Sequence, residues 1–202
     1  SVEAMLLHRF LAAAGMKFRA HSPPAGADVV WETVPPYVMH EMLSLDTDAD
    51  IGGAAVPEPY ATIAVNSGIA RKLCTTSSLW KNHPGSVFVL SNTVLQNSPD
   101  DVDNLVSVFI KTAEKLNSGP DQETLTDAAR FLDCDTELVS RILASSGTCF
   151  DPQLLVPDIQ MLTTIRDYMT DTMKTLDNQT EITDLADPSF FLNRLKETIC
   201  EN

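Results

Sequence analysis

The chain has 202 residues, of which 44% are hydrophobic and 21% charged, a composition that excludes wholesale disorder. Acidic side chains number 28 against 14 basic ones, and the net charge of -14 argues against a nucleic-acid backbone or an anionic lipid surface as partner. Residues 99–202 carry 20 of the acidic and 8 of the basic side chains, so most of the excess negative charge lies in the second half.

Hydrophobic periodicity and turn residues predict a mixture of helices and strands in the first half. The predicted elements are a helix over 2–14 between Ser1 as N-cap and Gly15, a strand over 29–34, a short helix from Pro35-Pro36 to about Leu45, a strand over 49–56, a helix to about Asn66 and a strand over 86–90. This alternation favours an open α/β sheet with crossover connections between parallel strands.

The second half is predicted to be helical. Its expected helices run from Ser98-Pro99 to Gly119-Pro120, over 125–132, over 138–143 with Asp135 as cap, over 159–176, and from Asp187-Pro188 to about Ile199. Each helix carries an apolar stripe, which we interpret as core.

The four cysteines Cys74, Cys134, Cys149 and Cys200 form no CxxC pair, so a structural zinc site is not expected. Two alternatives stay open: a Cys134–Cys149 disulfide in an oxidising compartment, or four free thiols. No apolar run approaches the roughly 20 residues of a membrane span, and no signal peptide is visible. Because Ser1 leads directly into a helix, we expect a mature form or a fragment.

No catalytic constellation is found. His40-Glu41 begins like a zinc-protease motif, but Ser44 stands where the second histidine ligand is required. A nucleophile elbow and a phosphate-binding loop are both missing from the sequence. We therefore expect a protein that is not an enzyme, with no catalytic residue, no metal and no cofactor.

The string Pro57-Glu58-Pro59-Tyr60-Ala61-Thr62 lies where the second predicted strand passes into a helix. Ligands of open α/β sheets lie near such junctions, where free N–H groups at a helix N-terminus suit an oxyanion. Pro59 fits the first position of the helix. The alternative is that Glu58-Pro59 only sets the start of the helix and that Tyr60 packs in the core.

A second string, from Ser78 to Gly85, is predicted to be a loop before a strand. Trp80, Lys81, Asn82 and His83 bring together an aromatic ring, a cation, an amide and an imidazole, a set that suits a small-ligand pocket. Alternatively, Trp80 covers an edge of the fold while Lys81 and His83 face solvent.

Seven ordered pieces of sequence resemble the solute-binding proteins of nitrate/sulfonate/taurine/bicarbonate-type ABC importers, which include binders of thiamine-pyrimidine precursors. The pieces are Ser1 with Met5-Leu6-Leu7-His8-Arg9 and Ala14-Gly15-Met16; Asp50 to Thr62; Trp80 to Pro84 with Val87-Phe88-Val89-Leu90; Asn97-Ser98-Pro99 with Asp101; Leu154 to Asp158; Tyr168-Met169; and Asp184 to Phe190. Together they extend over nearly the whole chain.

The resemblance implies a bilobal periplasmic-binding-protein fold that closes on a small solute and delivers it to the permease of an ABC importer, outside the cytoplasm. It implies an α/β lobe over 1–92 and a mainly helical region over 93–202 that completes the other lobe. The solute is expected to be a nitrate-, sulfonate- or bicarbonate-like anion or a small heterocycle. The candidate ligand-binding residues in the cleft are Ser1, Glu58, Tyr60, Trp80 and His83.

One departure from the family pattern leaves three alternatives for how this chain completes its fold. Family members have an N-terminal portion before the helix with which this chain begins. The chain is therefore expected to be a fragment, to repack its helices, or to form a homodimer through exposed C-terminal helices. A sensory or interaction domain that keeps the fold without transport is the alternative function. A related pyrimidine synthase would need a cysteine-dense motif, and the four cysteines here are dispersed.

Overall fold

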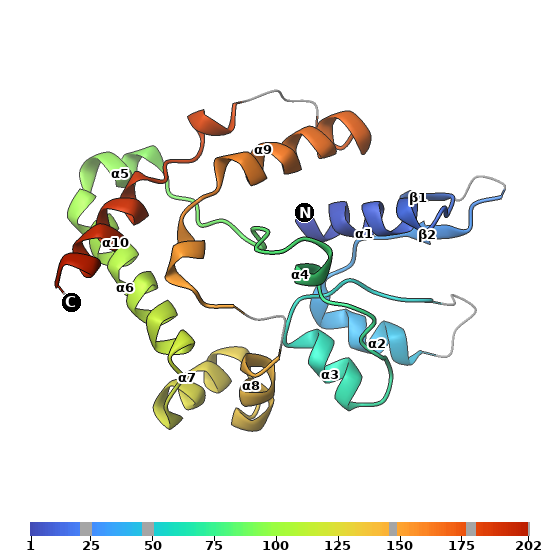
Figure 1. The fold of residues 1–202 in the computed structure, drawn as a ribbon. Coiled ribbons are helices and arrows are strands. Elements are labelled where there is room, and N and C mark those ends of the chain that lie inside the picture. Colours follow the sequence, from blue (N-terminus) through green and yellow to red (C-terminus); the bar gives the residue numbers. More distant parts are fainter. Residues whose placement is uncertain (21–25, 46–50, 146–148, 177–180, 202) are drawn as a thin grey trace. The chain divides into compact units, whose positions relative to one another are not determined.

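A computed structural model describes residues 1–20, 26–45, 51–145, 149–176 and 181–201 (Figure 1). The chain forms two compact units, and each draws segments from both halves of the sequence. The first unit comprises Ser1–Lys81 and Thr126–Gly147, and the second comprises Asn82–Leu125 and Thr148–Asn202. No helix in the described ranges is both long and apolar enough to span a membrane.

The first unit is built from short helices and one pair of strands. Its elements are α1 (Val2–Ala13), β1 (Phe18–Ala20), β2 (Val29–Trp31), a 3-10 turn (Pro36–Val38) leading into α2 (Met39–Ser44), α3 (Tyr60–Asn66), α4 (Thr76–Leu79), most of α7 (Gln122–Leu132) and α8 (Thr136–Leu143). The helices predicted to end near Ala14, Leu45 and Asn66 are confirmed.

Helix α1 begins and ends as its sequence predicts. The Ser1 Oγ accepts a hydrogen bond from the Ala4 N–H at 3.3 Å, and Gly15 adopts a left-handed φ of +71° just after the helix. One face buries Val2, Met5, Leu6 and Leu11, with Met5 fully inaccessible. The helix also contacts α4.

The only sheet among the described residues has two parallel strands, β1 and β2, with Phe18 opposite Val29. The predicted strand over 29–34 is therefore confirmed in its first three residues, while β1 was not predicted. The strand predicted over 86–90 is wrong, as is the described part, 51–56, of the strand predicted over 49–56. A strand needs a neighbour for its main-chain groups, and the described residues provide none at these places. The described residues thus form a mostly helical fold and not the predicted open α/β sheet lobe.

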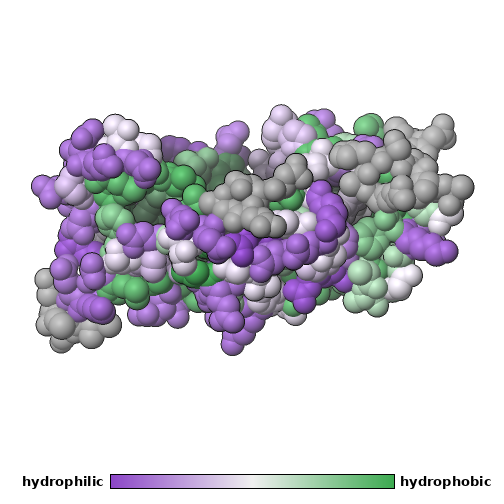
Figure 2. Space-filling model, turned by 90° about the horizontal axis from the view of Figure 1, so that it is seen from above, coloured by the Kyte–Doolittle hydropathy of each residue, from purple (hydrophilic) through white to green (hydrophobic). Residues whose placement is uncertain are grey.

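The second unit is helical. It contains α5 (Asn92–Asn97), α6 (Pro99–Asn117), the start of α7, a 3-10 turn (Pro152–Leu155), α9 (Ile159–Asp167), a π-helix (Tyr168–Thr172), a 3-10 turn (Ile182–Asp184) and α10 (Ser189–Glu201). Its core joins α6 to α10 (Figure 1) through Val106, Ile110 and Leu195, with Phe190 and Phe191 packed against them. The apolar stripes of α6 and α10 thus pack on each other. The face seen in Figure 2 also carries hydrophobic residues between the hydrophilic ones that cover most of it.

The helix predicted over 159–176 is shorter in the structure. Helix α9 passes into the π-helix at Tyr168, and the chain leaves the helix at Lys174, whose φ is +55°. There the Thr175 N–H donates to the Met169 carbonyl at 2.9 Å, a bond that closes a helix end. Helix α6 begins at Pro99 as predicted, but the Ser98 side chain makes no capping bond to it.

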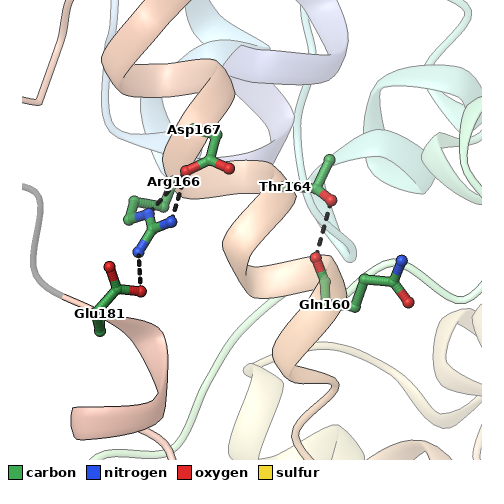
Figure 3. A network of polar contacts seen from close by, with 5 residues as sticks. All are labelled: Gln160, Thr164, Arg166, Asp167 and Glu181. Atoms are coloured by element: carbon green, nitrogen blue, oxygen red, sulfur yellow. Dashed lines mark hydrogen bonds and ion pairs between the residues drawn. The ribbon is translucent and has the colours of Figure 1, made fainter.

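A polar network holds α9 to the segment that follows it (Figure 3). The Arg166 Nε and Nη2 donate to the Asp167 Oδ1 at 2.8 and 2.7 Å, and its Nη1 donates to the Glu181 Oε2 at 3.2 Å. These two carboxylates raise the pKa of Arg166, whose side chain is only 18% exposed. The ion pairs therefore join α9 to the start of the 3-10 turn at Ile182.

Candidate functional site

Glu58, Pro59 and Tyr60 lie at the start of α3. The Glu58-Pro59 peptide is cis, and buried Pro59 occupies the N-cap, one position before the predicted one. The half-buried Glu58 carboxylate turns back onto its own helix, where its Oε2 accepts the Thr62 N–H at 3.0 Å. The helix end that the sequence offers to an oxyanion is therefore already occupied by a carboxylate of the chain. Helix α3 also has only seven residues.

The opposite end of α3 is held by a histidine. The Ser67 Oγ donates to the Ile63 carbonyl at 2.8 Å and lies 3.3 Å from the His40 Nε2, which joins the end of α3 to α2. His40, which resembles the first ligand of a zinc protease, thus has a structural contact. Across the described residues, no group of three or more histidine, cysteine, aspartate or glutamate side chains is placed to hold a metal ion.

Ser1 and Trp80 are related through the packing of their helices. Ser1 is exposed and caps α1, whereas half-buried Trp80 directly follows α4 and donates its main-chain N–H to the Thr76 carbonyl at 2.9 Å. The main helix contacts of the first unit pair α1 with α4 and α2 with α3. The structure therefore brings the helix of Ser1 against the helix of Trp80, and places Glu58 and Tyr60 in the pair formed by α2 and α3.

His83 belongs to the second unit, whereas the other four candidate residues belong to the first. The chain turns between the units at Asn82, which has a left-handed φ of +57° and follows the exposed Lys81. His83 itself is half-buried. The loop predicted over 78–85 begins two residues late, because Ser78 and Leu79 still belong to α4.

The first unit also contains an open hollow of about 170 Å³ between α3 and α8. Its lining residues are Ile63, Asn66, Ser67, Asp135, Glu137, Leu138 and Arg141. The charged groups are already engaged, because Arg141 pairs with Glu137 and the Asp135 Oδ1 accepts the Leu138 N–H at 2.6 Å. None of the five candidate residues lines this hollow. Sequence reasoning missed it because α3 and α8 lie far apart in the chain.

None of the described cysteines lines this hollow. Cys74, Cys134 and Cys149 are free thiols, so the Cys134–Cys149 disulfide is not formed. Burial raises the pKa of half-buried Cys134, and the neighbouring carboxylates of Asp135 and Asp133 add to the effect. Its thiolate is therefore disfavoured, which makes Cys134 a poor nucleophile.

Two comparisons find proteins that are similar to parts of this chain. It is 26% identical over 98 residues to the "Nitrate/nitrite binding protein NrtA" of Nostoc sp. (strain PCC 7120 / SAG 25.82 / UTEX 2576). The match covers 48% of this chain and 22% of that relative, so the chain spans only a small part of the relative's length. No solved structure matches the chain. The model of the NMT1-like family matches residues 1–133, and the chain therefore belongs to the NMT1-like family.

Proposed function

We propose that this chain is part of a solute-binding protein, which takes up a small solute and delivers it to the permease of an ABC importer. The family match over residues 1–133 is the observation that carries the proposal. The similarity to a nitrate/nitrite binding protein supports it. The proposal includes an extracytoplasmic location, a cleft between lobes that divide at 92/93, and binding without catalysis.

Glu58 is the proposed anchor for the solute. Because its Oε2 accepts the Thr62 N–H, the carboxylate is fixed in place and its Oε1 is left to accept a hydrogen bond from a solute. A hydrogen bond to a charged group is worth about 1.5–3 kcal/mol, more than one between neutral groups. A bare anion placed beside this carboxylate would be repelled. The arrangement thus favours a small heterocycle that carries N–H donors.

Aromatic and polar side chains complete the proposed site. Tyr60 and Trp80 offer half-buried rings on which a flat heterocycle can stack, and the Ser1 hydroxyl and His83 imidazole offer further hydrogen bonds. A nitrate-like anion is the second candidate, because the similar protein from Nostoc is named for nitrate and nitrite. Such an anion would need Lys81, the cation beside Trp80, as its partner.

A thermal-shift series with an aminopyrimidine, nitrate, bicarbonate and taurine tests the proposal. A solute at about one hundred times its Kd stabilises the native state by about 2.7 kcal/mol, so binding raises Tm. We expect the aminopyrimidine to raise Tm and the Glu58→Gln variant to abolish the rise. The glutamine amide oxygen can still accept the Thr62 N–H, so this variant keeps the cap while it removes the charge and replaces the Oε1 acceptor with an NH2 donor.

Each other outcome of the thermal-shift series leads to a different conclusion. A rise in Tm with nitrate that Glu58→Gln leaves intact or strengthens supports the anion and contradicts the heterocycle. If none of the four solutes raises Tm, the proposal of solute binding by this chain is contradicted. A Tm lowered in Glu58→Ala but not in Glu58→Gln, without any solute, reports only the local cap at α3.

A further inference from the structure

Three aromatic rings from three elements meet in the first unit. The ring centroids of His8 on α1 and Phe18 on β1 are 4.6 Å apart, and the two ring planes are nearly perpendicular at 85°. The indole of Trp31 on β2 lies 5.9 Å from both of these rings. In Figure 1 the two strands accordingly lie beside α1. This cluster, His8 with Phe18 and Trp31, is half-buried throughout.

The two strands are too short to be stable by themselves. Each has three residues, and a two-stranded sheet is marginally stable by itself in water. Their ends are tied to each other, because the Lys17 N–H donates to the Asp28 Oδ2 at 2.8 Å and the Asp28 N–H donates to the Lys17 carbonyl at 2.7 Å. These bonds join strand to strand, whereas the ring cluster joins the strands to α1.

We propose that His8 holds the two-stranded sheet on α1 while its imidazole is neutral, and that protonation of His8 releases the sheet. A neutral imidazole packs on aromatic rings as a third ring. The imidazolium is strongly hydrated, and its charge is disfavoured in a half-buried apolar cluster. The cluster is therefore a pH-sensitive latch between α1 and the sheet.

Residues of both charges occur on α1 and beside the two strands. They are Glu3, Arg9, Lys17, Asp28 and Glu32, three acidic and two basic. Helix α4, which also packs on α1, has no charged residue. Burial is accordingly what lowers the pKa of His8 below 6.5.

The lowered pKa of His8 determines in which direction pH affects the contact. Because the folded state binds the proton of His8 more weakly than the unfolded state, protonation opposes the folded contact. The contact is thus fully formed above a pH of about 6.5, the ordinary histidine pKa, and is lost as pH falls through the lower pKa of His8.

Tryptophan fluorescence tests the latch in the whole chain. The chain has two tryptophans, so Trp80→Phe leaves Trp31 as the single reporter. We expect its emission maximum to shift to the red as pH falls from 8 to 4.5, with a midpoint below 6.5, because the released indole becomes hydrated. His8→Phe, which keeps a ring without a titrating nitrogen, should abolish the transition. The matched variant His40→Gln should keep it.

Three results would overturn the latch: a transition that persists in His8→Phe, a change in intensity without a red shift, or helix loss by far-ultraviolet circular dichroism with the same midpoint. If His8→Phe does not fold, His8→Gln takes its place, because glutamine is also neutral throughout this range. A proton NMR titration of the His8 imidazole must give the same midpoint as the fluorescence. A different midpoint would assign the transition to another group and would also overturn the proposal.

Discussion

At the scale of the residue, helix caps are the interactions that the sequence predicts best. Asp135 is the clearest case, because its Oδ1 accepts the Leu138 N–H at 2.6 Å at the start of α8. Loss of such a cap costs about 1 kcal/mol. We therefore expect Asp135→Ala to lower the free energy of unfolding by about 1 kcal/mol in urea titrations, and Asp135→Asn to lower it much less. Equal losses in the two variants would show that the charge, and not the hydrogen bond, is what stabilises α8.

Interactions between residues a few positions apart could be predicted at the candidate site, and those that depend on side-chain conformation could not. The cap at Ser1 depends on a residue three positions away, so sequence spacing alone predicts it. The string around Glu58 correctly predicts the start of a helix, but it also predicts that the N–H groups there are open to a solute oxyanion. Sequence spacing could not show that the Glu58 side chain turns back to the Thr62 N–H, because that choice depends on the rotamer. The binding roles of the five candidate residues stay predictions.

At the scale of the element, the contact between α6 and α10 is the core of the second unit. Leu195 on α10 is 6% exposed and packs with Val106 and Ile110, whereas Leu192 on the same helix is 39% exposed. Truncating a buried leucine costs about 2–5 kcal/mol, and an exposed one costs much less. We expect Leu195→Ala to lower the urea midpoint strongly and Leu192→Ala to lower it slightly. Similar shifts for both variants would contradict the α6–α10 core.

Helices were predicted more accurately than strands because their hydrogen bonds are local. The apolar periods of α6, α7 and α8 and the cap of α8 lie within the segments that form them, so the existence of these helices follows from sequence. The segment 86–90 has equally strong strand residues, yet no other described residue pairs with its main chain. Strand formation depends on a partner elsewhere, and composition does not reveal whether it is present.

At the scale of the whole molecule, the grouping of segments was the least predictable feature. Residues 126–147 join the first unit, although they lie in the half of the sequence that was expected to form one helical region. The periodicity of α7 and α8 shows that each has an apolar face and does not show which surface covers it. The hollow between α3 and α8 therefore has no counterpart in any sequence pattern.

Charge and exposed apolar surface together determine how the molecule associates. The net charge of -14 keeps copies apart at neutral pH, but it vanishes near the isoelectric point of about 4.5. Val87, Phe88 and Val89 then form a run of apolar surface that can associate, because these consecutive residues are 59%, 59% and 78% exposed. No hydrogen bond joins the main chain of 86–90 to another described residue, so the segment offers open main-chain groups with which a second copy can pair.

A single added charge on this segment should therefore suppress association. We expect Val89→Lys to reduce light scattering between pH 4.5 and 5 relative to the unchanged chain, because a lysine at a strand edge opposes pairing. Val108→Lys is the matched control, because Val108 is also exposed, at 59%, and the substitution adds the same charge. Val108 lies in α6, where the hydrogen bonds of the helix already satisfy the main chain. If the two lysines reduce scattering equally, net charge alone controls association, and the open edge at 86–90 has no part in it.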